Sequence, residues 1–262
     1  MAERTSYVPG TPSWVDIGVP DTAKAAAFYG DLLGWSADFS GAEESGGYAM
    51  FTLRGKNVAG VGPQQTPDMP PFWTVYVTVV DAAATSEAVT AAGGTVMVPP
   101  MDIFDAGTMA VFQDSVGSFV SCWQPNQHIG CQLVNEPGAF TWNELSTTDL
   151  AAARDFYTTV FGWGVDAGSS GDDATIFTVG DNVTCGAHTA GEGEFPAWSI
   201  WFSVEDCDAS AQRVTELGGN VLVPPNDMSF GRGSVVMDDQ GAAFGIGAMD
   251  QVGGLTDVRR RA

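Results

Sequence analysis

Basic residues are the scarcest feature of this 262-residue chain. Lysine and arginine number 10 against 32 aspartate and glutamate residues, which gives a formal net charge of −22. Lys24 and Lys56 are the only lysines, and Arg259, Arg260 and Arg261 form one run near the end. Affinity for phosphate backbones and for anionic membranes depends on clustered cations. The sequence therefore excludes nucleic acid as a partner and gives no sign of a membrane surface.

Long apolar runs and paired cysteines are also missing. No stretch approaches the roughly 18 apolar residues of a membrane-spanning helix, and residues 1–10 lack the apolar segment of a signal peptide. The cysteines form no CxxC pair and read as buried, reduced thiols: Cys122, Cys131, Cys185 and Cys207. We predict a soluble cytoplasmic protein.

An internal repeat is the main feature that the sequence does contain. The segment from Trp14 to Asp21, followed by Phe28-Tyr29 and Gly34-Trp35, recurs in the same order from Trp142 onward. A second match links 73–100 to 198–225. So many ordered matches indicate a tandem duplication. The predicted organisation is domain 1 over 10–124, a connector over 125–137, domain 2 over 138–250 and a flexible tail over 251–262.

Each unit contains the same order of elements. Val15, Ile17 and Val19 alternate with less apolar positions, as in a half-buried strand. Asp21 is a suitable N-cap for an alanine-rich helix over 22–33, which Gly34 would end. A second helix is expected over 82–92, and strands over 48–53, 57–63, 72–80, 95–98, 108–113 and 118–123. The order βαβββ occurs twice per unit, so the predicted fold class is α+β with four modules.

Aromatic residues at helix-facing positions are expected to form the core. Phe28-Tyr29 and Phe156-Tyr157 lie on amphipathic helices, and Trp73 and Trp198 have the helix-facing parity of their strands. We expect these side chains to pack between helices and sheets.

The strand–Asp–helix–Phe-Tyr–Gly-Trp openings and the entries Gly93-Gly94 and Gly218-Gly219 resemble the vicinal oxygen chelate superfamily. That superfamily contains glyoxalase I, bleomycin-resistance proteins and extradiol dioxygenases. Two-domain glyoxalase-like proteins of actinobacteria are especially similar, and the resemblance spans residues 10–249. It implies two tandem glyoxalase-like domains whose curved open sheets form cup-shaped pockets. It also implies either a monomer with an internal pseudo-dimer or a homodimer.

The resemblance further implies where a divalent metal would bind. Members usually supply His, Gln and Glu from strand ends that face the cup. The equivalent positions here are Trp14, Thr74 and Ser121 in one domain and Trp142, Ser199 and Gly245 in the other. These side chains do not form a catalytic metal site, and His128 and His188 are the only histidines. We predict that the protein uses no metal and no other cofactor.

Strand alternation predicts which side chains line the two cups. If Val15 and Ile17 face the helices, Trp14 and Asp16 face the concave side, and the same alternation applies in domain 2. The expected lining is Trp14, Asp16, Thr74, Tyr76, Phe119, Ser121 and Trp123 in one cup, and Trp142, Glu144, Ser199 and Trp201 in the other. An aromatic lining with scattered hydroxyls predicts a pocket for a small apolar or aromatic molecule.

Asp16 and Glu144 are the candidate catalytic residues, and Glu144 is the first choice. With indoles around it and no cation identified nearby, Glu144 is expected to have a pKa raised toward neutrality and to act as a general base or acid. Asp16 holds the equivalent position in the other cup. The structural alternative is that both carboxylates accept backbone or indole N–H bonds and fix the strand ends.

Other residues also leave two interpretations open. Trp14 and Trp142 either stack on a ligand or fill the space of a lost metal. Arg232 either binds a substrate carboxylate or phenolate or forms a surface ion pair. His188, expected in a loop, is either a general base or a solvated side chain.

Three functions are therefore considered. The first is a metal-independent enzyme that acts on an apolar or aromatic molecule, such as a secondary metabolite, by carboxylate-assisted proton transfer. Isomerisation, cyclisation, ring opening and cofactor-free hydroxylation all suit such a site. The second is a protein that sequesters a drug-like aromatic compound. The third is a metal-dependent glyoxalase or lyase.

Overall fold

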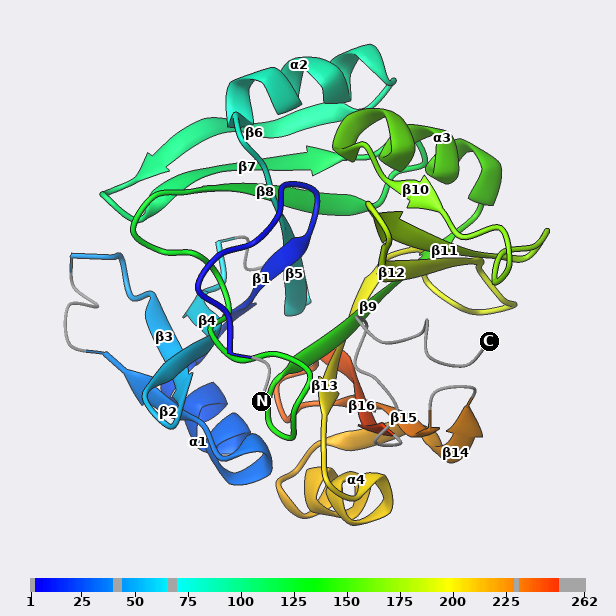
Figure 1. Ribbon diagram of the computed structural model, residues 1–262. Coiled ribbons are helices and arrows are strands. Elements are labelled where there is room, and N and C mark those ends of the chain that lie inside the picture. The colour runs from blue at the N-terminus through cyan, green and yellow to red at the C-terminus, as the bar shows by residue number, and fades with distance from the viewer. Residues whose placement is uncertain (1–2, 40–43, 66–69, 229–230, 250–262) are drawn as a thin grey trace.

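The computed structural model describes residues 3–39, 44–65, 70–228 and 231–249, in which two curved, open sheets are packed together (Figure 1). Both sheets are eight-stranded and mixed, with equivalent strand orders. This confirms the predicted α+β class and the repeated unit. The predicted tail over 251–262 lies outside the described residues.

Sheet 1 has the order β2-β3-β4-β1-β5-β8-β7-β6. Its central strands β1 and β5 are antiparallel, and each has a parallel neighbour on its other side. The elements of domain 1 are β1 (Pro12–Val19), α1 (Thr22–Leu33), β2 (Ser36–Asp38), β3 (Ala49–Leu53), β4 (Lys56–Pro63), β5 (Phe72–Thr78), α2 (Ala82–Ala91), β6 (Thr95–Ile103), β7 (Gly107–Gln113) and β8 (Phe119–Pro125).

Sheet 2 repeats this topology as β10-β11-β12-β9-β13-β16-β15-β14. Strands β9 and β13 take the central places of β1 and β5. The elements of domain 2 are β9 (Phe140–Thr147), α3 (Leu150–Phe161), β10 (Gly164–Val165), β11 (Ala174–Val179), β12 (Asn182–Thr189), β13 (Trp198–Ser203), α4 (Cys207–Glu216), β14 (Asn220–Met228), β15 (Gly231–Met237) and β16 (Ala243–Met249).

The helix signals in the sequence are confirmed. The Asp21 side chain accepts a hydrogen bond from the backbone N–H of Lys24 at 3.0 Å, and Gly34 ends α1 with a φ of 76°. Asp149 and Gly162 act in the same way on α3. A side-chain oxygen satisfies an N–H that the first turn leaves unpaired, and glycine adopts the left-handed conformation without a Cβ penalty.

Strand boundaries differ from the prediction mainly at sheet edges. The short strand β2 was missed, and β6 runs to Ile103, beyond the predicted end at residue 98. Pro99 and Pro100 are tolerated because β6 is an edge strand, and its pairing with β7 shifts register between Val98 and Met101. Prolines therefore marked a bulge here and not a strand end.

The two domains are joined by buried aromatic side chains and two buried carboxylates. The Tyr29 hydroxyl donates to Asp238 Oδ2 at 2.9 Å, and Trp73 Nε1 donates to the Tyr29 oxygen at 3.1 Å. Asp238 also accepts backbone N–H bonds from Gln240 and Ala242. The expectation that Tyr29 and Trp73 are core residues is confirmed, and the core that they form extends into the other domain.

The duplication repeats this contact in the opposite direction. Tyr157 donates to Asp114 Oδ2 at 2.8 Å, and Trp198 Nε1 donates to the Tyr157 oxygen at 2.8 Å. Helix α2 accordingly lies beside α3, and α1 beside α4 (Figure 1). Each helical layer thus combines one helix from each domain.

All four cysteines are buried and free. Within the described residues, every helix falls short of the length and apolar character that a bilayer crossing requires.

The cross-domain contact predicts a measurable stability loss. Tyr29→Phe removes the hydroxyl that donates to Asp238, so we expect the free energy of unfolding in urea to fall by about 1–3 kcal/mol. Tyr157→Phe should match it, because Asp114 loses the equivalent donor. Tyr7→Phe is the control, since the Tyr7 hydroxyl donates to a neutral carbonyl, that of Cys131. A loss no larger than that of the control would contradict this account.

Candidate functional site

The central strands carry the predicted cup residues on one face of each sheet. On sheet 1, Trp14 lies opposite Tyr76 and Asp16 lies opposite Thr74 across β1 and β5. On sheet 2, Trp142 lies opposite Trp201 and Glu144 lies opposite Ser199. We call these sets cup face 1 and cup face 2. Ser121 and Trp123 extend cup face 1 on β8, beside Tyr76 and Thr78.

Asp16 is held by hydroxyl groups at the middle of cup face 1. Its Oδ2 accepts hydrogen bonds from the Tyr76 hydroxyl at 3.0 Å and from the Tyr48 hydroxyl at 3.1 Å. Trp14 Nε1 donates to the Tyr48 oxygen at 3.1 Å and so fixes the orientation of that phenol. The result is a carboxyl group with two phenolic partners and, among the described residues, no cation beside it.

Burial raises the pKa of Asp16 from 3.8 to about 6, although hydrogen bonds from Tyr76, Tyr48 and Thr74 act to lower it. Removal from water disfavours the charged form, and neutral donors compensate only in part. Burial beside Asp16 likewise raises the pKa values of Tyr48 and Tyr76, so both phenols stay protonated. Asp16 therefore holds its proton to a higher pH than an ordinary aspartate does.

Sequence reasoning missed Tyr48, which directly precedes β3. Its ring lies across Gly60 and Gly62 of β4, and a Cβ at Gly60 would collide with its hydroxyl oxygen. Gly60 is the register partner of Asp16. The alternating glycines Gly60 and Gly62 could have predicted a side chain packed across this strand, because glycine in a strand often marks the close approach of another group.

Cup face 2 has a different chemistry at the equivalent position. Trp142 Nε1 donates to Glu144 Oε2 at 2.6 Å, and His188 Nδ1 lies 3.3 Å from Glu144 Oε1. His188 Nε2 lies 2.9 Å from Oε1 of Glu194. The hydrogen bond to Glu144, aided by Glu194, raises the pKa of His188 from 6.5 to about 9. At neutral pH the imidazolium donates to both carboxylates.

Two expectations about this site are corrected. His188 lies on strand β12 and not in a loop, so its side chain reaches across to β9. Glu144 is not remote from a cation, because the protonated His188 contacts it. The predicted basis for choosing Glu144 before Asp16 is therefore absent, and it is Asp16 that has no cationic neighbour in the described part of the chain.

Exposure separates the two faces at one pair of equivalent positions, since Trp14 is buried and Trp142 is half-buried. Asp16 and Glu144 are both half-buried, as are Thr74 and Ser199, and Tyr76 and Trp201 are both buried. The aromatic side chains of cup face 1 pack against neighbours: the Trp14 ring meets the His128 ring edge-on at 4.4 Å, and Trp123 Nε1 donates to the His128 carbonyl. Phe119, the first residue of β8, is exposed.

The positions that hold a metal in the superfamily carry unsuitable groups here. Trp14, Thr74 and Ser121 share cup face 1, and none of them supplies a carboxylate or an imidazole. At Gly245, even a Cβ would collide with the indole of Trp201, so that side chain fills the space of a ligand. Within the described ranges, no three or more His, Cys, Asp or Glu side chains are placed to hold a metal. The donor set does not fit a catalytic divalent ion.

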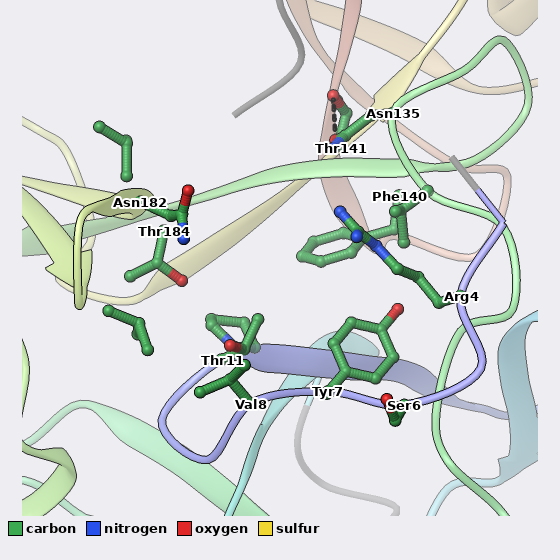
Figure 2. Close-up of a pocket in the computed structure, with 14 residues that line it drawn as sticks. Arg4, Ser6, Tyr7, Val8, Thr11, Asn135, Phe140, Thr141, Asn182 and Thr184 are labelled. Atoms are coloured by element: carbon green, nitrogen blue, oxygen red, sulfur yellow. Dashed lines mark hydrogen bonds between the residues drawn. The ribbon is translucent and has the colours of Figure 1, made fainter. Parts of the chain in front are cut away.

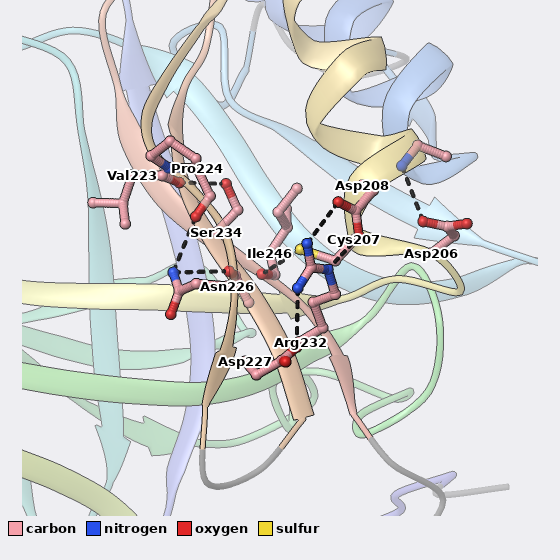
Figure 3. Close-up of polar contacts among 12 residues, drawn as sticks. Asp206, Cys207, Asp208, Val223, Pro224, Asn226, Asp227, Arg232, Ser234 and Ile246 are labelled. Carbon is pink, nitrogen blue, oxygen red and sulfur yellow. Dashed lines mark hydrogen bonds and ion pairs between the residues drawn. The ribbon is translucent and has the colours of Figure 1, made fainter.

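Arg232 lies away from cup face 2. Its neighbour Gly233 faces the Trp201 indole, so Arg232 on β15 takes the opposite side of the sheet. There Arg232 pairs with Asp208 of α4 and with Asp227, at 2.9 Å to each (Figure 3). This corrects the expectation that Arg232 binds substrate in the cup and favours the surface ion pair.

The comparisons with known proteins agree with the repeat and the sheets. The model of the Glyoxalase/Bleomycin resistance protein/Dioxygenase superfamily matches residues 11–120 and again 137–246. The chain belongs to this superfamily. The resemblance to the vicinal oxygen chelate proteins is thereby confirmed.

Curated relatives match over nearly the whole chain. Anthracycline biosynthesis protein DnrV of Streptomyces peucetius is 38% identical over 259 residues, covering 92% of this chain and 94% of DnrV. The protein CFP32 of Mycobacterium tuberculosis is 39% identical over 254 residues, covering 94% of this chain and 97% of CFP32.

Solved structures are similar in fold only. The Mn(II)-bound glyoxalase from Novosphingobium aromaticivorans has a TM-score of 0.64 at 16% identity, covering 92% of this chain and 82% of the glyoxalase. The 2,2′,3-trihydroxybiphenyl 1,2-dioxygenase of Sphingomonas wittichii has a TM-score of 0.64 at 18% identity, covering 97% of this chain and 94% of the dioxygenase.

The pKa of Asp16 predicts a pH-dependent stability cost. Because the folded-state value is raised, the folded protein binds the proton more tightly than the unfolded chain between the two pKa values. Stability from this group is therefore lost as the pH rises from about 4 to about 6. We expect Asp16→Asn to gain stability relative to the parent as the pH rises through this window, measured by urea unfolding at each end. A stability difference that does not change with pH would contradict the burial of this carboxyl.

Proposed function

We propose that this protein is a metal-independent enzyme of secondary metabolism that moves a proton on a fused aromatic substrate, with Asp16 as the acid–base group. The observation that carries the proposal is the Asp16 carboxyl between Tyr48 and Tyr76, with a pKa of about 6. A group that both accepts and returns a proton works best when its pKa lies near the operating pH.

The substrate class rests on the lining and on the relatives. Trp14, Tyr48 and Tyr76 surround Asp16 with aromatic rings, whose faces suit flat apolar molecules. The relative DnrV is named for anthracycline biosynthesis, and anthracyclines are fused-ring phenolic compounds. We therefore assign a hydroxylated polycyclic aromatic compound as the substrate class.

The side chains around Asp16 have defined tasks in this reaction. The Asp16 carboxylate removes a proton from a carbon acid or a phenol and returns it to another atom of the same molecule. Isomerisation and cyclisation balance with this single proton and need no oxidant. Tyr48 and Tyr76 donate to the carboxylate and orient it, and Trp14 holds Tyr48 in place. Trp14 and Tyr76 are buried, whereas Asp16 itself is half-buried, so part of this residue stays accessible to a substrate.

Glu144 is assigned a positioning role in this proposal. Its carboxylate is shared between the Trp142 indole N–H and the His188 imidazolium, so it is already paired. Glu144→Gln is consequently the matched control for Asp16→Asn, because both variants replace the equivalent carboxylate in one domain by an amide.

The activity prediction uses proton exchange as its readout. The parent enzyme, incubated with a panel of anthracycline aglycones in heavy water, is expected to incorporate deuterium and to release a rearranged product, both detected by mass spectrometry. Asp16→Asn should slow both by about 10²–10⁴-fold, whereas Glu144→Gln should have a much smaller effect. The rate of the parent should fall below about pH 6, where Asp16 is protonated.

Two outcomes would reject this proposal. Stoichiometric binding of an aglycone by the parent without exchange or product would make the protein a sequestering protein. Full activity in Asp16→Asn with loss in Glu144→Gln would assign catalysis to the other domain.

Metal independence has its own test. The replaced ligand positions and the indole over Gly245 leave no suitable donor set. We expect the purified protein to contain far less than one transition metal per chain and to keep its activity after EDTA treatment. Loss of activity with EDTA and recovery with added Mn²⁺, Zn²⁺, Ni²⁺ or Fe²⁺ would contradict the prediction.

A further inference from the structure

A cavity of about 180 Å³ lies between the N-terminal segment of domain 1 and the second domain, and none of its lining residues belongs to a cup face. Its walls come from residues between 4 and 12, from connector residues 134 and 135, from the start of β9, from the last residue of β11 and from the start of β12. Figure 2 shows the Arg4 side chain extending toward the middle of this space.

Arg4 differs from the other lysine and arginine side chains of the described residues because its guanidinium has no hydrogen-bonding or ion-pair partner there. The other lysine and arginine side chains of the described residues all have partners: Lys24 with Asp239, Arg54 with Glu136, Lys56 with Glu3, Arg154 with Thr175, Arg213 with Glu216, and Arg232 with Asp208. The half-buried Arg4 guanidinium forms no hydrogen bond or ion pair with any side chain or carbonyl group in the described part of the chain.

The repeat allows the surroundings of Arg4 to be compared with those of its equivalent residue. Gly10 and Gly138 are equivalent, since each carbonyl accepts a bond from the equivalent tryptophan. By the same spacing, Arg4 is equivalent to Gln132. Gln132 is hydrogen-bonded to Asn57 of β4 on both sides: its backbone N–H donates to the Asn57 carbonyl, and its side chain accepts the Asn57 N–H at 2.9 Å. The contact with β4 of domain 1 is therefore closed by Gln132, whereas at the equivalent place beside β12 of domain 2 the chain has Arg4 and the cavity.

The lining indicates the chemical class of a ligand. A guanidinium binds a carboxylate through two parallel hydrogen bonds. The buried Thr184 adds a hydroxyl group, whereas the Thr141 hydroxyl already donates to Asn135 Oδ1 at 3.2 Å. Phe140, Val134 and Val183 supply apolar surface. A cavity near 150 Å³ is known to hold a single benzene ring, so the available space limits the ligand to about that size.

We propose that this cavity binds a small organic monocarboxylate, with its carboxylate on Arg4 and one ring or a short branched chain against Phe140 and Val183. The site is separate from Asp16 and does not depend on the function proposed for the cup.

Titration calorimetry of the full chain with benzoate tests the proposal. We expect a Kd on the order of 1 mM or tighter, and at least about tenfold weaker binding of benzamide, which has the same shape without the charge. Naphthoate, with two fused rings, should bind more weakly than benzoate because the cavity is too small for it.

Variants locate the binding. Arg4→Gln introduces the residue found at the equivalent position in domain 1 and should weaken benzoate binding by about tenfold or more. Arg4→Lys keeps the charge without the forked geometry and should give an intermediate Kd. Arg213→Gln changes the net charge equally on α4, outside the cavity lining, and should bind like the parent, as should Asp16→Asn. Melting curves verify that each variant is folded.

The proposal is overturned if benzoate gives no binding heat at about tenfold above 1 mM or if benzamide binds as tightly. Equal benzoate affinity in Arg4→Gln and the parent would also overturn it, as would loss of benzoate binding in Asp16→Asn alone.

Discussion

The paired contacts between a tyrosine of one domain and an aspartate of the other determine how this protein is assembled. Tyr29 with Asp238, and Tyr157 with Asp114, place two carboxylates in the interior. Buried carboxylates are stable only when their oxygens are satisfied, and here the backbone N–H groups of a turn and the phenol of the opposite domain satisfy them together. Neither domain completes this set of hydrogen bonds alone.

This assembly decides which face of each sheet remains for chemistry. Aromatic residues such as Trp73 and Phe202 are committed to the core between the domains, where their rings meet at 5.0 Å. The opposite face of the sheets carries Tyr76 and Ser199 on those two strands, and Asp16 and Glu144 on the neighbouring strands β1 and β9. One alternation along β1 and β5 therefore separates residues that hold the domains together from residues that form the candidate site.

Duplication preserved the backbone and changed the partners of equivalent residues. Asp16 and Glu144 occupy the same place, yet one is bound by phenols and the other by an indole and an imidazolium. Position 4 and position 132 differ in the same manner, since arginine faces a cavity where glutamine seals a junction. Each change alters charge and proton affinity at an unchanged site in the fold, which is how one scaffold acquires different sites.

The sequence by itself determined the duplication, the βαβββ order, the aspartate caps and the side of the sheet on which Asp16 and Trp14 lie. These features depend on contacts between residues a few positions apart, and such contacts leave a period or a capping pattern in the sequence. Only the tertiary structure decided that Tyr48 reaches Asp16, that His188 reaches Glu144, and that Arg4 faces a cavity. Those partners are set by the register of β4 on β1 and of β12 on β9, and by the packing of one domain on the other. Local periodicity does not encode register between distant strands, so the charge of a neighbour, and with it the proton affinity of a carboxyl, is decided only when the chain has folded.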